Sequence, residues 1–326
     1  MQTPRVRSIA LGKQGLAGRL TPMTNLRHAT GILDLSVPRI MGVVNASPES
    51  FSDNAELASA GLKQRVDHAL SLVGDGAHVL DIGGQSARTD PAEIDVNIEI
   101  DRVVPLIEAI RSASDVVISV DTYRPEVGRA ALGAGASIIN DVSGLAHLDL
   151  ARIAAEAGAG FIIMHTRLAP KVRLKTTDAF YVDSNAVRRD VKDFLQERLQ
   201  VLTDLGITKE HVIVDPGPDF AKTPAQTVAA LQGVGELQEL GMPILLALSR
   251  KDFVGAATGQ PPRGRAAGTL AAIGYCIERA PHSLLRVHDV AATRDFLAVY
   301  EVLRGERSLE WNVPLADHLR YDRPTA

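Results

Sequence analysis

The sequence predicts a single (β/α)8 TIM barrel with an N-terminal extension, and two observations support this fold class. From Ile40 onward, eight short apolar runs alternate with stretches of helical periodicity. Such alternation is typical of a parallel sheet covered by helices, and eight repeats favour a closed barrel over an open sheet. The chain has 326 residues, which exceeds the roughly 250 that one barrel requires.

The predicted strands are apolar on both faces, as in parallel sheets that are buried on both sides. Just before the first of them, Ile32–Leu35 predicts an extra strand that could close the bottom of the barrel. The eight barrel strands are predicted at Ile40–Val44, His78–Leu80, Val116–Val120, Ser137–Ile139, Phe161–Met164, Val212–Val214, Ile244–Leu248 and Leu284–Val287.

One intervening helix is recognised from apolar residues at helical spacing, which would place them on a single buried face. Its apolar residues are Val187, Val191, Phe194, Leu195, Leu199 and Leu202. Cys276 lies in another apolar helical stretch, so we expect it to serve as buried packing and not as a nucleophile.

The first thirty residues differ from the rest of the chain because they are rich in arginine and contain no acidic residue. We therefore expect residues 1–30 to be a flexible extension and residues 31–326 to form the barrel. The formal net charge of −4 argues against nucleic acid or an acidic membrane as a partner. No apolar run approaches the ~18 residues of a membrane span, and we expect a soluble, cytoplasmic protein.

A polar residue follows each predicted strand. In a barrel the carboxyl ends of the strands share one rim, where active sites lie, so these side chains should converge on one pocket. An alternative is that they merely cap the helices that follow, although Lys, Arg and His are poor N-caps. The residues at this rim are Asn45, Asp81, Asp121, Asn140, Asp141, His165, Asp215, Ser249, Arg250, Lys251, Arg286 and His288.

The short acceptors Asp121, Asn140 and Asp215 suit a polar flat ring, because a carboxylate matches the paired N–H donors of an aminopyrimidinone. Lys251 could reach a nitrogen or carbonyl oxygen of that ring. His165 is more simply interpreted as a strand-end histidine that is hydrogen-bonded to its neighbours than as a catalytic residue.

A second, cationic group at the rim consists of Arg286 and His288, with Arg88 on an early loop. Cations beside a donor such as Asn45 suit a phosphate or pyrophosphate. A Mg²⁺ ion bridging the phosphate oxygens is plausible there, since Mg²⁺ usually binds through substrate phosphates and few protein ligands. The residues alone therefore indicate a flat heterocycle and an anionic leaving group without naming either.

Several ordered segments resemble the dihydropteroate synthase family. "LDLSVPRIMGVVNASPESFSD" at 33–53 is similar to the first family signature, and "DIGGQSAR" at 81–88 to the second. "SVDTYRPEV", "IND", "MH", "DPGPDFAKT", "SRKDFVG", "GTLAA" and "RVHDV" follow in family order. The resemblance runs from about residue 31 to about residue 304, and it implies the pterin-binding barrel of that family.

The resemblance implies a transferase of folate biosynthesis that condenses 6-hydroxymethyl-7,8-dihydropterin pyrophosphate with p-aminobenzoate and releases pyrophosphate. It assigns four residues to pterin binding, three to pyrophosphate with Mg²⁺ held through Asn45, and four to catalysis. It also implies a homodimer formed through helices near the C-terminus. The pterin-binding residues implied are Asp121, Asn140, Asp215 and Lys251. The pyrophosphate-binding residues are Asn45, Arg286 and His288. The catalytic residues are Asp121, Lys251, Asp53 and Arg88.

The sequence departs from the family pattern where the family binds the acceptor. Thr89 and Asp90 replace the proline and glycine of the family's S-T-R-P-G loop, where the proline lines the aminobenzoate ring. Asp219 replaces a glycine, and Asp252 replaces a serine that helps to hold the aminobenzoate carboxylate in the family. A carboxylate at Asp252 would repel another carboxylate. The alternative interpretation is a divergent paralogue that binds the pterin pyrophosphate but uses another acceptor, or a non-catalytic pterin-binding protein.

Overall fold

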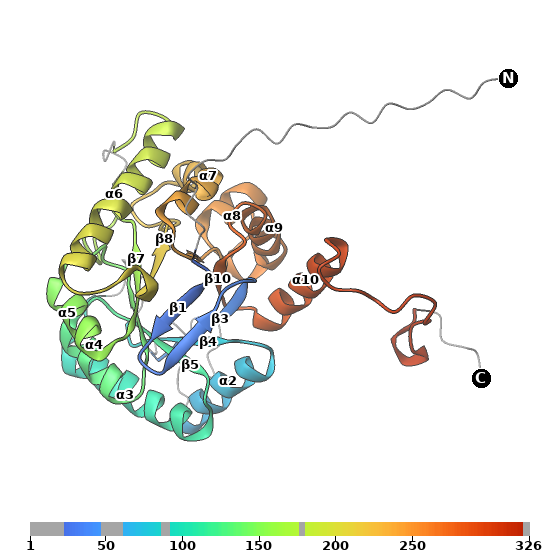
Figure 1. Ribbon diagram of the computed structural model, residues 1–326, viewed down its shortest axis with the longest axis horizontal. Helices are drawn as coiled ribbons and strands as arrows, with labels where there is room; N and C mark the ends of the chain where they lie inside the picture. Colours follow the sequence, from blue (N-terminus) through green and yellow to red (C-terminus); the bar gives the residue numbers. More distant parts are fainter. Residues whose placement is uncertain (1–22, 47–60, 86–91, 176–179, 322–326) are drawn as a thin grey trace.

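The computed structural model describes residues 23–46, 61–85, 92–175 and 180–321. Eight parallel strands close into a barrel in the order β10-β3-β4-β5-β6-β7-β8-β9, which confirms the predicted fold class (Figure 1). The barrel strands are β3 (Arg39–Asn45), β4 (Val79–Gly83), β5 (Val117–Asp121), β6 (Ile138–Asp141), β7 (Gly160–Met164), β8 (Val212–Asp215), β9 (Ile244–Leu246) and β10 (Ser283–Val287).

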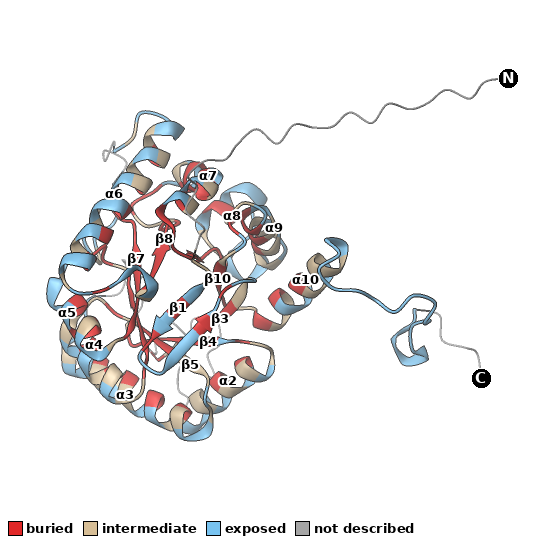
Figure 2. Cartoon of the chain, viewed as in Figure 1, coloured by how far each residue is buried: buried red, intermediate tan, exposed pale blue. Residues whose placement is uncertain are grey.

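Helices surround the strands and bury one apolar face each against them (Figure 2). The face predicted for the longest helix is confirmed, because all six of its apolar residues are buried in α6. Cys276 is also buried in α9, where desolvation raises the pKa of its thiol to about 12. The helices are α2 (Leu62–Gly74), α3 (Val96–Ala113), α4 (Pro125–Gly133), α5 (Leu148–Ala157), α6 (Ser184–Asp204), α7 (Pro224–Gln232), α8 (Asp252–Thr258), α9 (Ala266–Ile277) and α10 (Val290–Leu303).

The predicted carboxyl ends of β7 and β10 are confirmed, and the other six strand ends need correction by one to three residues. Asn45, Asp121 and Asp215 are the last residues of their strands, and Asp81 lies within β4. The prediction ended each strand at its last apolar residue. In a barrel, however, polar side chains near the carboxyl ends can point into the mouth while their backbone continues the ladder.

The bottom of the barrel is closed by a hairpin of β1 (Asn25–His28) and β2 (Gly31–Asp34). Its residue Leu26 is fully buried and packs in the same cluster as Met41, Ile138 and Ile162 of the barrel strands. The predicted strand at Ile32–Leu35 is therefore confirmed, apart from a shift of one residue. The boundary of the extension at residue 30 was placed too late, because β1 already belongs to the packed fold.

The barrel ends with α10, whereas the predicted domain extended to residue 326. The described residues after Leu303 are all exposed, including the short 3₁₀ helix η5 (Asp317–Leu319). They lead away from the barrel beyond α10 (Figure 1). Of the helices in the described ranges, none is both long and apolar enough to cross a membrane.

Candidate active site at the barrel mouth

The carboxyl ends of the strands bring seven of the predicted residues to one mouth. Register pairs Asp121 with Asn140 on neighbouring strands, and Arg286 of β10 reaches across to β4 and β5. Lys251 follows β9 as the residue before α8. The residues brought together are Asn45, Asp121, Asn140, Asp215, Lys251, Arg286 and His288.

The guanidinium of Arg286 joins two carboxylates at this mouth. Its Nε donates to Asp81 Oδ2 at 2.6 Å, and its Nη2 donates to Asp121 Oδ2 at 2.7 Å. The sequence predicted Arg286 as a cation for pyrophosphate and did not foresee these two partners. The arginine therefore neutralises the carboxylates of Asp81 and Asp121. Asp81 belongs to the mouth although it was not among the predicted ligand-binding residues.

Two buried oxygens at the mouth lack a hydrogen-bond partner within the described part of the chain. They are Asn140 Oδ1 and Asp81 Oδ1. Asn140 Nδ2 donates to the other oxygen of Asp81 at 3.1 Å, which fixes both side chains. Buried polar atoms are nearly always paired in folded proteins. Two unpaired acceptors side by side at a barrel mouth are therefore suited to the N–H donors of a ligand.

Burial controls the charge of these carboxyl groups. Burial raises the pKa of Asp215 to about 6, although the Gly217 amide and the nearby Lys251 lower it. The pKa of Asp121 is also raised, by burial and by Asp81, while Arg286 opposes the rise. The mouth therefore holds carboxylates that are ready to accept both hydrogen bonds and protons close to neutral pH.

The turn between β8 and α7 has an unusual backbone. Gly217, Asp219 and Ala221 have φ angles of +64°, +66° and +51°. The left-handed conformation costs a non-glycine residue about 1–2 kcal/mol. A Cβ on Gly217 would lie only 2.0 Å from the carbonyl oxygen of His165, so this position requires glycine. The turn therefore retains a glycine-like conformation at Asp219 even though the side chain is larger.

Asp219 and Asp252 have local partners that the sequence analysis missed. Asp219 Oδ1 accepts from the Thr227 hydroxyl at 3.0 Å, and its Oδ2 accepts from the Asp252 amide at 2.5 Å. The carboxylate of Asp252 forms an ion pair of 2.9 Å with Arg265. The carboxylate of Asp219 therefore links the starts of α7 and α8.

His165 has the structural role that was expected. It is fully buried, its Nε2 lies 2.9 Å from Asp190 Oδ2, and its Nδ1 lies 2.7 Å from the ammonium of Lys222. Burial and the charge of Lys222 lower the pKa of the imidazole well below its usual value. Lys222 was not among the predicted site residues, because nothing in the sequence shows that a lysine in the turn before α7 directs its ammonium toward His165.

His288 and Lys251 are held by neighbours at the mouth. His288 Nδ1 lies 3.0 Å from the hydroxyl of Ser249. The ammonium of Lys251 lies 4.5 Å from the centre of the Phe220 ring, a cation–π contact that orients the lysine. The predicted residues Asp53, Arg88, Thr89 and Asp90 lie outside the described residues.

A hydrogen-bond network lies beside the mouth, around the start of α3. Tyr123 donates to Glu93 at 2.7 Å and accepts from Gln85 at 2.9 Å. Arg124 forms ion pairs with Glu93 and with the buried Glu99. These contacts tie the ends of β4 and β5 to the residues that lead into α3, and they stiffen this side of the rim.

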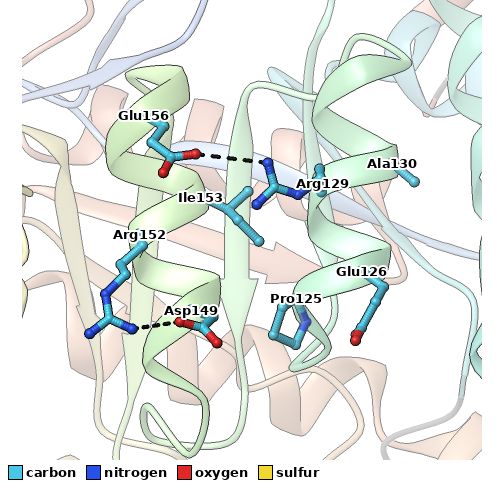
Figure 3. Close-up of a pocket in the computed structure, with 8 residues that line it drawn as sticks. All are labelled: Pro125, Glu126, Arg129, Ala130, Asp149, Arg152, Ile153 and Glu156. Carbon is cyan, nitrogen blue, oxygen red and sulfur yellow. Dashed lines mark hydrogen bonds and ion pairs between the residues drawn. The ribbon is translucent and has the colours of Figure 1, made fainter.

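A separate groove lies between α4 and α5 on the outside of the barrel (Figure 3). Both of its arginines form ion pairs, Arg129 with Glu156 and Arg152 with Asp149. The groove offers no unpaired buried acceptor of the kind found at the mouth among the described residues. The mouth is therefore the better candidate for the active site.

Comparisons with known proteins agree with this geometry. A family model for a pterin binding enzyme matches residues 41–288. The dihydropteroate synthase of Streptococcus pyogenes serotype M1 is 38% identical over 267 residues, which cover 81% of this chain and 95% of that protein. The chain belongs to the dihydropteroate synthase family. The transferase family expected from the sequence motifs is therefore confirmed.

Solved structures of the dihydropteroate synthase family share the fold. The Xanthomonas albilineans enzyme with 4-aminobenzoic acid has a TM-score of 0.77 and 38% identity, over 89% of this chain and all (100%) of that one. A structure of the X. albilineans enzyme in complex with 7,8-dihydropteroate has a TM-score of 0.74 and 37% identity, over 88% of this chain and 100% of that one.

The ion pairs of Arg286 lead to a stability prediction. Replacing Arg286 with Met leaves Asp81 and Asp121 without their cation, and breaking a buried pair in this way costs about 3–5 kcal/mol. We expect this loss of unfolding free energy at about pH 8 and a smaller loss at about pH 6. The folded pKa of Asp121 lies above its unfolded value, so proton uptake on acidification favours the folded state. Urea unfolding at the two pH values measures both effects.

The control is Arg304→Met, which removes an ion pair with Glu306 whose side chains are 50% and 51% exposed. Exposed pairs contribute about 0–1 kcal/mol, so this variant should unfold like the wild type. Equal losses in the two variants, or a loss for Arg286→Met that does not depend on pH, would contradict the assigned role of Arg286.

Proposed function

We propose that this chain condenses 6-hydroxymethyl-7,8-dihydropterin pyrophosphate with p-aminobenzoate and releases pyrophosphate. The observation that carries the proposal is the pair of buried acceptors Asn140 Oδ1 and Asp81 Oδ1, which have no hydrogen-bond partner among the described residues and lie at the same mouth as Asp215. A pterin ring presents several N–H donors along one edge and would satisfy such acceptors. The relatives' name and the ligands of the X. albilineans structures support the same substrates.

In this proposal Asp121, Asn140, Asp215 and Lys251 bind the pterin. Asp215 and Asn140 accept hydrogen bonds from ring N–H groups, and Lys251 donates to a ring nitrogen or carbonyl oxygen. The cation–π contact with Phe220 holds Lys251 in position. Asp81 joins this set through its unpaired oxygen.

We propose that the reaction begins when the bond between the pterin methylene carbon and the pyrophosphate oxygen breaks. The electron pair leaves with pyrophosphate, and the carboxylate of Asp121 stabilises the positive charge that remains on the pterin. The amine then attacks the methylene carbon and releases its proton to solvent or to pyrophosphate. The protein acts mainly by positioning the reactants and by electrostatic stabilisation.

We assign Asn45, Arg286 and His288 to the pyrophosphate. Arg286 would bind the pyrophosphate while its hydrogen bonds to Asp81 and Asp121 remain. The positive charge of Arg286 would then be shared between these two carboxylates and the leaving group. Asp53 and Arg88 remain proposed catalytic residues from the family pattern. Thr89 and Asp90 remain proposed residues of the altered acceptor site.

We propose Mg²⁺ as the cofactor. In the described ranges, no group of three or more His, Cys, Asp or Glu side chains is placed to hold a metal ion. Such a mouth fits an ion that is bound mostly by substrate phosphates, and Asn45 at the end of β3 would be its protein ligand. When bound, Mg²⁺ neutralises charge on the departing pyrophosphate.

A second candidate function is supported by the ion pair between Asp252 and Arg265. Because Arg265 is paired with Asp252, its positive charge is less available to bind the carboxylate of an acceptor such as p-aminobenzoate. A paralogue that binds the pterin pyrophosphate but takes an acceptor without a carboxylate, or takes none, would have this arrangement. The two functions share the pterin pocket and differ only in the acceptor.

We also propose a homodimer in the cytoplasm. Val299 and Leu303 of α10 are 60% and 82% exposed, and Trp311 in the following segment is 91% exposed. Val299 and Leu303 are four residues apart on α10 and so share one face of the helix, and exposed apolar faces of this kind mark interaction surfaces. A single buried cysteine suits a reducing compartment.

Light scattering should give twice the chain mass of 34.8 kDa, and Leu303→Lys should shift the measured mass toward that of the monomer. A wild type that stays monomeric at all concentrations would refute the dimer.

Turnover tests the proposed reaction. The purified chain with the pterin pyrophosphate, Mg²⁺ and p-aminobenzoate should release pyrophosphate. Asp215→Asn should lower kcat/KM by about 10–100-fold, because a buried hydrogen bond between the carboxylate and the ring is lost or weakened. Asn can still accept from the Gly217 amide, so this variant should remain folded.

Asp149→Asn is the matched control, because Asp149 pairs with Arg152 in the outer groove (Figure 3). It should keep wild-type turnover. No release of pyrophosphate above the blank at high concentrations of wild-type enzyme would remove dihydropteroate synthesis as the function.

Substitution of Asp252 separates the two candidate acceptors. Asp252→Ser removes the exposed carboxylate that pairs with Arg265, so KM for p-aminobenzoate should fall by about 2–5-fold, the effect of about 0.5–1 kcal/mol at an exposed charge. Use of aniline, which lacks the carboxylate, should not improve. Steady-state kinetics with both amines measures the difference.

Asp252→Glu keeps the negative charge and serves as the matched control. It should leave the preference between the two amines unchanged. If Asp252→Ser improved both amines equally, or if Asp252→Glu improved p-aminobenzoate as much, charge at position 252 would not determine acceptor choice.

A further inference from the structure

The ammonium of Lys222 is buried at the side of the pterin pocket and contacts acceptors from two parts of the chain. Only 4% of Lys222 is exposed. Its Nζ lies 2.7 Å from His165 Nδ1, 2.9 Å from the carbonyl of Gly217 and 3.1 Å from the carbonyl of Phe220. A fourth contact of 3.3 Å reaches the carbonyl of His165.

We propose that Lys222 is a positioning residue of the pterin site, which fastens the turn between β8 and α7 to the end of β7. This inference rests on the proposed function, because it takes Asp215 and Lys251 as pterin ligands. No contact between Lys222 and substrate is required. Its effect passes through the turn that it holds.

The turn carries two of the groups that the pterin pocket uses. The Gly217 amide donates to Asp215 Oδ1 at 2.7 Å and so orients that carboxylate. The Phe220 ring lies 4.5 Å from the ammonium of Lys251. Lys222 binds the carbonyls of these same two residues, so a shift of its ammonium would move both Asp215 and the support of Lys251.

The conformation of the turn explains why a fastening is needed. Asp219 and Ala221 are held at positive φ, a region that residues other than glycine rarely adopt. Such a conformation persists only where the surroundings hold it in place. Lys222 supplies donors on the inside of the turn, and Asp219 holds its outside through Thr227 and the amide of Asp252.

The chemistry of the pocket around Nζ requires a lysine. All four contacts are acceptors, and an ammonium offers three donors and no acceptor. Since Lys222 donates to His165 Nδ1, the imidazole is neutral and carries its proton on Nε2, which donates to Asp190 at 2.9 Å. Asp190 also accepts from the Tyr181 hydroxyl at 2.8 Å and forms an ion pair with Arg167. These contacts fix the carboxylate that orients His165.

Lys222 also acts on Asp215 through its charge. Burial raises the pKa of Asp215, while Lys251, Lys222 and Arg286 lower it. Burial lowers the pKa of Lys222 to about 7, with Asp215 and Asp219 opposing the fall and Lys251 and Arg167 adding to it. Lys222 is therefore charged in the pH range where Asp215 takes up its proton. Removing that charge should raise the pKa of Asp215 further.

The decisive experiment compares Lys222→Met and Lys222→Gln in the full chain. Calorimetry measures the affinity for 6-hydroxymethyl-7,8-dihydropterin pyrophosphate from about pH 5.5 to about pH 8.5, and circular dichroism checks folding. Lys222→Met should bind the pterin at least about tenfold more weakly at about pH 7, where wild-type Lys222 still carries much of its charge and Asp215 is mostly ionised, equivalent to about 1.4 kcal/mol. Lys222→Gln keeps two donors without the charge and should lose less affinity.

In both variants the loss of binding on acidification should begin at a higher pH than in the wild type. The carboxylate of Asp215 must be ionised to accept from the ring, and it protonates earlier without Lys222. A role in folding alone would reduce the folded fraction without moving this pH limit. Lys192→Met is the control, since Lys192 forms an ion pair with Glu239 on the outside of the barrel.

A folded Lys222→Met variant with wild-type affinity and an unchanged pH limit would overturn the proposal. If that variant does not fold, Lys222→Gln tests the proposal instead. An unchanged pH for the onset of lost pterin binding in Lys222→Gln would then overturn it. If the wild type itself binds no pterin, the proposed function fails. The positioning role is then tested by carbon NMR of the Asp215 carboxyl group without ligand. An unchanged pKa of Asp215 in the variants would refute it.

Discussion

The buried cation of Arg286 is the interaction on which the mouth of the barrel depends. Asp81 and Asp121 come from neighbouring strands, and parallel register brings Asp81 beside Ser119 and Asp121 beside Asn140. Without a cation between them, two carboxylates would face one another in a site that excludes most water. Arg286 reaches both from β10, so three strands of the barrel are linked by one planar side chain.

The same arrangement makes the mouth costly to fold and suited to bind. Burial raises the pKa of Asp215 and Asp121, which means that their ionised forms are less favourable in the folded chain than in water. A ligand with N–H donors would compensate these carboxylates and the oxygens of Asn140 and Asp81 that have no partner in the described part of the chain. Groups that weaken the unliganded fold can in this way strengthen binding, a common relation between stability and function.

Strand periodicity was sufficient to predict the barrel, because eight apolar runs with polar ends leave few other ways to bury both faces. It also placed Asn140, Asp215 and Arg286 at a common rim. It could not predict which polar side chains pair with one another. The bonds from Arg286 to Asp81 and Asp121, and from Arg265 to Asp252, depend on rotamers and on contacts between distant segments. Lys222 was missed for the same reason. The hairpin strand Asn25–His28 was missed because it lies in a stretch whose composition resembled an extension.

The departures from the family pattern are not independent of one another. Asp219 accepts from the amide of Asp252, and Asp252 pairs with Arg265, so the two altered positions share one set of contacts at the starts of α7 and α8. Reverting Asp219 to glycine would remove the acceptor of the backbone amide of Asp252, whereas reverting Asp252 to serine would remove the ion pair with Arg265 and keep that amide. Contacts of this kind make substitutions at neighbouring positions non-additive. The acceptor side of the mouth is therefore best regarded as one coupled unit, whereas the pterin side is built around Arg286 and the turn held by Lys222.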